Sequence, residues 1–129
     1  MRDYVTEAGR TEPTDHKQIQ ERYDSERMVR MMHGALGLVT ESAELADALK
    51  KHLYYGKPLD TTNIKEEIGD IFWYAALICR TLDVSFEDVM YKNIEKLRAR
   101  FPQKFSESDA INRDLGEERR VLESDVSSE

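Results

Sequence analysis

Two pairs of acidic residues, Glu41 with Glu44 and Glu67 with Asp70, are the residues of this chain best suited to chemistry. Each pair has an i, i+3 spacing, which puts both carboxylates on one face of a helix. The surrounding stretches are otherwise apolar, where an uncompensated charge is costly. Carboxylate oxygens are the ligands that Mg²⁺ prefers in proteins. The sequence therefore predicts a Mg²⁺ site at these four residues, with Mn²⁺ as a substitute metal.

Carboxylates that hold metal ions predict a reaction on a polyphosphate. Such metals neutralise phosphate oxygens, orient the scissile phosphorus and lower the pKa of a bound water. One acidic pair alone is usually a solvated helix face, so the prediction depends on both pairs together. Gly69 lies inside the second pair, where glycine costs about 1 kcal/mol relative to alanine. We expect close approach of the facing helix, or of a ligand, to offset that cost.

A second group, Asn93, Lys96 and Arg100, shares one face of a later helix because its spacings are three and four residues. Lys96 and Arg100 are predicted to bind phosphates, with Arg100 able to make bidentate contacts. Asn93 is a candidate hydrogen-bond partner for a sugar, a base or a phosphate. Taken alone, the two basic residues would be ordinary surface residues.

The elements that must position these groups are helices, because the apolar residues recur with a helical period. No strand pattern and no Asn-Gly turn is found. Gly56 and Pro58 are predicted to stop a helix, and Ser85 to cap the start of one. The prediction is an all-α, four-helix bundle that oligomerises through its wide apolar faces. The four helices are expected at 15–32, 33–53, 63–82 and about 86–101.

Three regions are expected along the chain. Residues 1–14 are predicted to be a flexible polar leader, and 15–105 to form the catalytic domain. Residues 106–129 are predicted to be a charged tail that either forms a helix against a partner subunit or frays.

Composition excludes several functional classes. The net charge is −7, which argues against nucleic-acid binding through dense basic residues. The single cysteine, Cys79, cannot form an intrachain disulfide and fits a reducing, cytoplasmic setting; it is expected in the core. No signal-like segment and no apolar run of about 18 residues occurs, so no membrane association is expected.

Several segments resemble the MazG-like all-α nucleoside triphosphate pyrophosphohydrolases. The family hallmark is ExxE, a spacer, and then ExxD. Here ExxE lies in GLVTESAELAD (37–47), ExxD lies in EEIGD (66–70), and 22 residues separate Glu44 from Glu67. NIEKL (93–97) and RFP (100–102) are similar to the fourth-helix pattern of the family.

The resemblance implies a Mg²⁺-dependent enzyme that converts an NTP or dNTP to the monophosphate and pyrophosphate, in a housecleaning role. It implies that Glu41, Glu44, Glu67 and Asp70 bind the metals and that one glutamate activates the attacking water. It also implies phosphate contacts at Lys96 and Arg100, and a homodimer or homotetramer.

Two alternatives stay open at this stage. A phosphoribosyl-ATP pyrophosphatase would use the same chemistry on a larger substrate. A non-catalytic helical module would bind a nucleotide or a partner protein without turnover.

Overall fold

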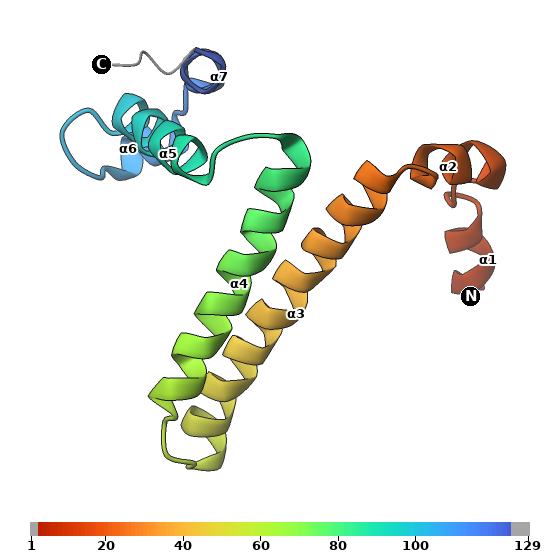
Figure 1. The fold of residues 1–129 in the computed structure, drawn as a ribbon, viewed down its shortest axis with the longest axis horizontal. Coiled ribbons are helices and arrows are strands. Elements are labelled where there is room, and N and C mark those ends of the chain that lie inside the picture. The colour runs from red at the N-terminus through yellow and green to blue at the C-terminus, as the bar shows by residue number, and fades with distance from the viewer. Residues whose placement is uncertain (1–2, 125–129) are drawn as a thin grey trace. The chain divides into compact units, whose positions relative to one another are not determined.

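The structure, a computed structural model, describes residues 3–124 as helices joined by short connections (Figure 1). No strand occurs within these residues, which confirms the all-α prediction. The chain divides into two compact units, one ending at Ile78 and one starting at Cys79. The helices are α1 (Tyr4–Gly9), α2 (His16–Tyr23), α3 (Glu26–Tyr55), α4 (Thr61–Leu82), α5 (Phe86–Arg100), α6 (Glu107–Ile111) and α7 (Leu115–Glu123).

Helix α3 begins earlier than predicted. The expected boundary between two helices at Met32 and His33 is wrong, because α3 runs through it without a break. The true boundary is at Ser25, whose backbone is extended and whose hydroxyl accepts a hydrogen bond from the Met28 N–H at 3.1 Å. Serine is a preferred N-cap because it satisfies one of the free N–H groups of the first turn.

The turn between α3 and α4 is defined by local chemistry. Gly56 ends α3, as predicted, and it does so in the left-handed conformation, with φ 65°. Asp60 then starts α4, because its carboxylate accepts hydrogen bonds from the backbone N–H groups of Thr62 and Asn63 at 3.0 and 3.1 Å. The result is an antiparallel hairpin of two long helices (Figure 1).

Two glycines let the hairpin helices approach closely. Gly34 and Gly37 are buried on α3. A Cβ added at Gly34 would lie 2.5 Å from Ile78 Cγ1, and one added at Gly37 would overlap the Tyr74 ring. Gly69, by contrast, has nothing within 4 Å of an added Cβ. The expectation that Gly69 admits the facing helix is therefore wrong, and the alternative of a ligand stays a prediction.

In the second unit, the C-terminal helix α7 packs against α5. Ser85 caps α5 as predicted, accepting from the Asp88 N–H at 3.2 Å. Lys92 donates from Nζ to Ser124 Oγ at 3.0 Å. The region expected to form a charged tail thus contains α6 and α7, and α7 packs against α5 of the same chain. Residues 125–129 of the predicted tail lie outside the described part.

The region expected to be a flexible leader contains α1. Asp3 caps this helix by accepting from the Val5 N–H at 3.2 Å, and none of its residues is buried. Residues 1 and 2 of the predicted leader lie outside the described residues.

The described part of the chain has little core of its own. Cys79 is buried, as predicted, but no large side chain there is fully buried. Many apolar side chains on the long helices are instead exposed, including Val39 at 68% and Phe72 at 57%. No helix between residues 3 and 124 combines the length and the apolar character needed to cross a membrane.

Candidate metal centre

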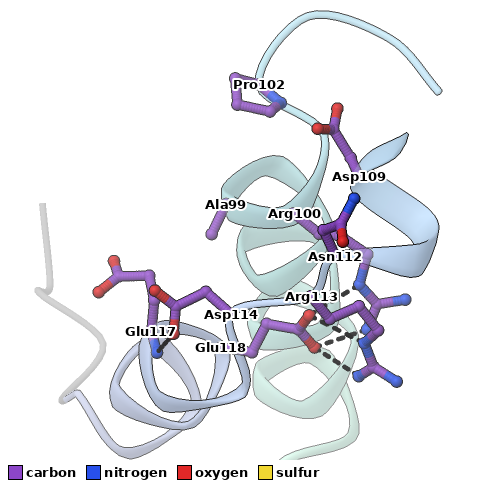
Figure 2. A pocket seen from close by; sticks show the side chains of 9 residues that line it. All are labelled: Ala99, Arg100, Pro102, Asp109, Asn112, Arg113, Asp114, Glu117 and Glu118. Atoms are coloured by element: carbon purple, nitrogen blue, oxygen red, sulfur yellow. Dashed lines mark hydrogen bonds and ion pairs between the residues drawn. The ribbon is translucent and has the colours of Figure 1, made fainter. Parts of the chain in front are cut away.

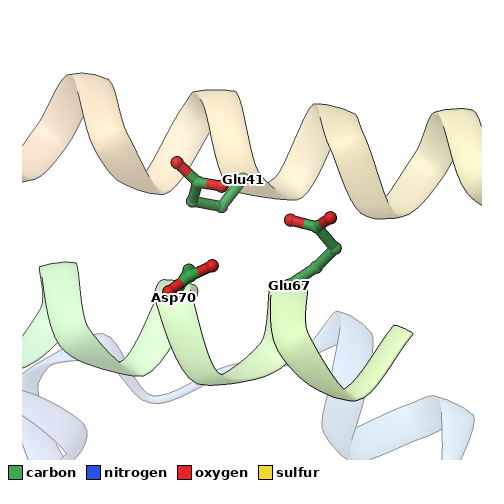
Figure 3. A group of neighbouring side chains, drawn as sticks. All are labelled: Glu41, Glu67 and Asp70. Atoms are coloured by element: carbon green, nitrogen blue, oxygen red, sulfur yellow. The ribbon is translucent and has the colours of Figure 1, made fainter. Parts of the chain in front are cut away.

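Three of the four predicted carboxylates converge between α3 and α4. Glu41 projects from α3, while Glu67 and Asp70 project from α4 toward it (Figure 3). One carboxylate oxygen from each residue lies within 4.8 Å of one from each of the others. The i, i+3 spacing of Glu67 and Asp70 keeps both on the same face of α4, as the sequence predicted.

Glu44 is placed differently from the other three. It is exposed, one turn beyond Glu41, and it does not join the tight group. It lines a cleft next to the group together with Glu67. The structure thus brings Glu41, Glu67 and Asp70 together and leaves Glu44 at the edge.

The carboxylate side chains on α4 differ in burial. Glu67 is only 5% exposed and accepts a hydrogen bond from Asn63 Nδ2 at 2.7 Å. A buried carboxylate needs such partners, because burial removes its hydration. Sequence reasoning missed Asn63, although its i, i+4 spacing to Glu67 on an expected helix was a usable signal. Glu66, the neighbouring carboxylate, is exposed.

Repulsion among the carboxylates is visible at Glu41. The pKa of Glu41 is raised above its ordinary value, first by partial burial and then by the negative charge of Glu44. Asp70 and Glu67 raise it further, while a hydrogen bond from the Thr40 hydroxyl opposes the shift. Both leading causes penalise the ionised form of Glu41. A cation placed between these oxygens would reverse that penalty.

The donor set fits a hard divalent cation. All the converging atoms are carboxylate oxygens, the ligand type that Mg²⁺ and Mn²⁺ favour. Mg²⁺ usually keeps several waters and takes only a few protein carboxylates, so three converging residues suffice. When bound there, the ion would supply charge neutralisation for phosphate oxygens and a more acidic water.

The predicted phosphate-binding residues lie on α5, in the second unit. Lys96 Nζ donates to Asn93 Oδ1 at 2.6 Å, which confirms that these two residues share a face. Their contact with substrate stays a prediction.

Arg100 is already engaged by a carboxylate. Its Nε and Nη2 donate to the two oxygens of Glu118 at 2.9 and 2.6 Å. Arg113 donates to the same two oxygens at 3.1 and 2.7 Å, so two guanidinium groups converge on one buried carboxylate (Figure 2). This cluster was not predicted from the sequence, because Arg100 and Glu118 lie 18 positions apart.

The sequence of this chain is similar to those of known proteins. The chain is 31% identical over 81 residues to the gene 37 protein of Mycobacterium phage L5, covering 60% of this chain and 71% of that protein. No solved structure gives a significant match. The MazG nucleotide pyrophosphohydrolase domain matches residues 33–105, which include all four predicted metal-site residues. The chain therefore belongs to the MazG nucleotide pyrophosphohydrolase family.

Proposed function

We propose that the protein hydrolyses a nucleoside or deoxynucleoside triphosphate to the monophosphate and pyrophosphate, with Mg²⁺ as cofactor. The observation that carries the proposal is the convergence of Glu41, Glu67 and Asp70 on facing helices. Membership of the family supports the reaction class. A housecleaning role in the nucleotide pool and a cytoplasmic location belong to the same proposal.

The proposed reaction assigns a task to each side chain. Glu41, Glu67 and Asp70 would hold the cation, with Glu44 completing its surroundings from the edge of the site. Water attacks the α-phosphorus, the bond to the bridging oxygen breaks, and pyrophosphate leaves. One of the glutamates takes the proton of the attacking water. Lys96, with Asn93, would contact phosphates or the nucleoside. Arg100 would do so only after releasing Glu118, to which its Nε and Nη2 donate.

We further propose that the working form is a homodimer or homotetramer. The argument is the apolar surface of the hairpin, since Leu36 and Val39 on α3 and Phe72 and Trp73 on α4 are all exposed. Monomeric proteins rarely leave large contiguous apolar patches in water, so we expect exposed apolar residues of this number and size to be covered. A second copy of the chain would cover it without any other partner.

A substrate panel tests the reaction. Mg²⁺-dependent turnover is measured on all canonical NTPs and dNTPs, dUTP and phosphoribosyl-ATP, with chromatography of the products. Monophosphate plus pyrophosphate from one of them is the expected result, and phosphoribosyl-ATP as the only substrate would select the histidine-synthesis enzyme. Diphosphate plus phosphate would contradict the proposal. Tight Mg²⁺–nucleotide binding without any product would instead support the non-catalytic module.

The matched variants are Glu67→Gln and Glu66→Gln. Both remove one negative charge from adjacent positions of α4, but only Glu67 lies in the carboxylate group. Turnover should be lost in the first variant and kept in the second. Equal activity in both would contradict the assignment of the site.

A further inference from the structure

A cleft of about 420 Å³ continues from the metal centre toward the turn of the hairpin. Its volume is within the range of small-molecule pockets. It shares Glu44 and Glu67 with the carboxylate site, so a ligand anchored there can extend along it. All of its lining residues belong to the first unit: Glu44, Asp47, Ala48, Lys51, Lys57, Pro58, Asp60, Asn63 and Glu67.

The other two carboxylates that line the cleft, Asp47 and Asp60, are already compensated. Asp47 forms ion pairs with Lys50 and Lys51 at 2.5 and 2.6 Å, and these lysines lower the pKa of Asp47 to about 2. Asp60 is occupied by the backbone N–H groups at the start of α4. Neither carboxylate therefore needs a further cation.

Lys57 differs from Asp47, Lys51 and Asp60 in that its charged group has no partner among the described residues. Its ammonium group makes no ion pair or hydrogen bond with any residue that the structure describes. Glu44, at the opposite end, is likewise exposed and unpaired among those residues. The cleft thus has free carboxylate charge near the metal centre and a free ammonium group near the turn.

The backbone that carries Lys57 is held in place by three local features. Gly56 adopts the left-handed conformation at the end of α3, and the Lys57 N–H bonds back to the Lys51 carbonyl at 3.3 Å. The Lys57 carbonyl accepts a hydrogen bond from His52 Nδ1 at 2.8 Å. A fixed backbone reduces the entropy lost when a charged side chain meets a ligand.

We propose that Lys57 binds the terminal phosphates of the substrate, at the end of the cleft near the hairpin turn. This inference rests on the proposed function, because the metal centre is what would anchor the phosphate chain at the other end. An ammonium group is a strong donor to phosphate oxygens, and three donors on a flexible stem let it follow the terminal group. Lys57 thereby adds a phosphate contact to the hairpin itself, independent of α5.

The test compares Lys57→Gln with Lys65→Gln. Both remove one positive charge from the same hairpin, but the exposed Lys65 does not line the cleft. The probe is inorganic tripolyphosphate in the presence of Mg²⁺, with binding measured by calorimetry. Lys57→Gln should weaken binding by about tenfold, as expected for one lost charge-assisted hydrogen bond. Lys65→Gln should bind as the unaltered protein does, and circular dichroism confirms that both variants are folded.

The outcomes separate this inference from the proposed function. Weaker tripolyphosphate binding in Lys57→Gln alone supports the subsite, even if no nucleotide is hydrolysed by the unaltered protein. That combination would overturn the proposed function and leave the phosphate subsite standing. Equal binding in both variants would overturn the subsite whatever the turnover. Orthophosphate is the second probe. If Lys57→Gln weakens orthophosphate binding as much as it weakens tripolyphosphate binding, the assignment of Lys57 to the terminal phosphates is overturned.

Discussion

The close approach of α3 and α4 makes a quantitative prediction at Gly37. A methyl group there would overlap Cγ, Cδ1 and Cε1 of the Tyr74 ring. That ring is held by edge contacts to His33 and Trp73, with centroids 5.6 and 4.9 Å apart, so it cannot simply turn away. Overpacking of this kind costs about 1–3 kcal/mol. Since alanine gains about 1 kcal/mol over glycine in a helix, Gly37→Ala should lower the free energy of unfolding by about 1 kcal/mol.

Gly69→Ala is the matched control for this prediction. It is the same chemical change in the partner helix, but the added methyl group meets nothing within 4 Å. Only the helix-propensity gain remains, so this variant should be about 1 kcal/mol more stable than the unaltered protein. The two variants should therefore differ by about 2 kcal/mol. Gly34→Ala should fall between them, because its added methyl group meets Ile78 Cγ1 at 2.5 Å and overlaps no aromatic ring.

Urea unfolding followed by far-UV circular dichroism measures the difference. With a denaturant slope of about 2 kcal/mol per molar, the midpoints of Gly37→Ala and Gly69→Ala should lie about 1 M apart. The protein concentration is held constant, since self-association makes midpoints concentration-dependent. If both variants shift in the same direction by the same amount, the reasoning about the helix contact is refuted.

Three further predictions concern the metal, the charge cluster and the oligomer. Adding Mg²⁺ should raise the melting temperature of the unaltered protein but not of Asp70→Asn, because the cation relieves repulsion only where the carboxylates converge; equal shifts would contradict the site. Glu118→Gln should lower stability at pH 7. The guanidinium groups of Arg100 and Arg113 hold the pKa of Glu118 well below its usual 4.5, so this contribution is present above that pH and is lost as the pH falls through the folded-state pKa. Melting curves from pH 7 to pH 3 should show the two proteins converging, and a constant difference would rule out the ion pairs as its source. Val39→Glu should reduce the molecular mass in sedimentation, since it places a charge on the exposed apolar face of α3, and an unchanged mass would argue against that face as the subunit contact.

Local signals in the sequence were sufficient for much of the fold. Gly56 and Pro58 predicted the end of α3, and Ser85 predicted the start of α5, because caps and stops depend on residues a few positions away. The helix boundary predicted at Met32 was misplaced because the deciding signal is also local. Ser25 was an available capping signal, and it lay inside a stretch whose apolar pattern is too weak to show the break between α2 and α3.

The same locality limited what could be predicted about the packing of the hairpin. Gly34, Gly37 and Gly69 are alike as helix residues, and nothing near them in the sequence says which face meets another helix. The structure assigns the close contact to Gly34 and Gly37 and leaves Gly69 open. The pairing of Arg100 with Glu118 was hidden for the same reason, because it joins separate helices.

The sequence by itself determined which carboxylates share a helix face, since the i, i+3 spacing within each acidic pair is a property of one helix. Only the tertiary structure decided that Glu41, Glu67 and Asp70 converge while Glu44 stays at the edge, and that Lys57 lies in the same cleft as Glu67. Those placements depend on the register between α3 and α4. That register is set by how Gly34 and Gly37 pack against Ile78 and Tyr74, a contact between residues about 40 positions apart.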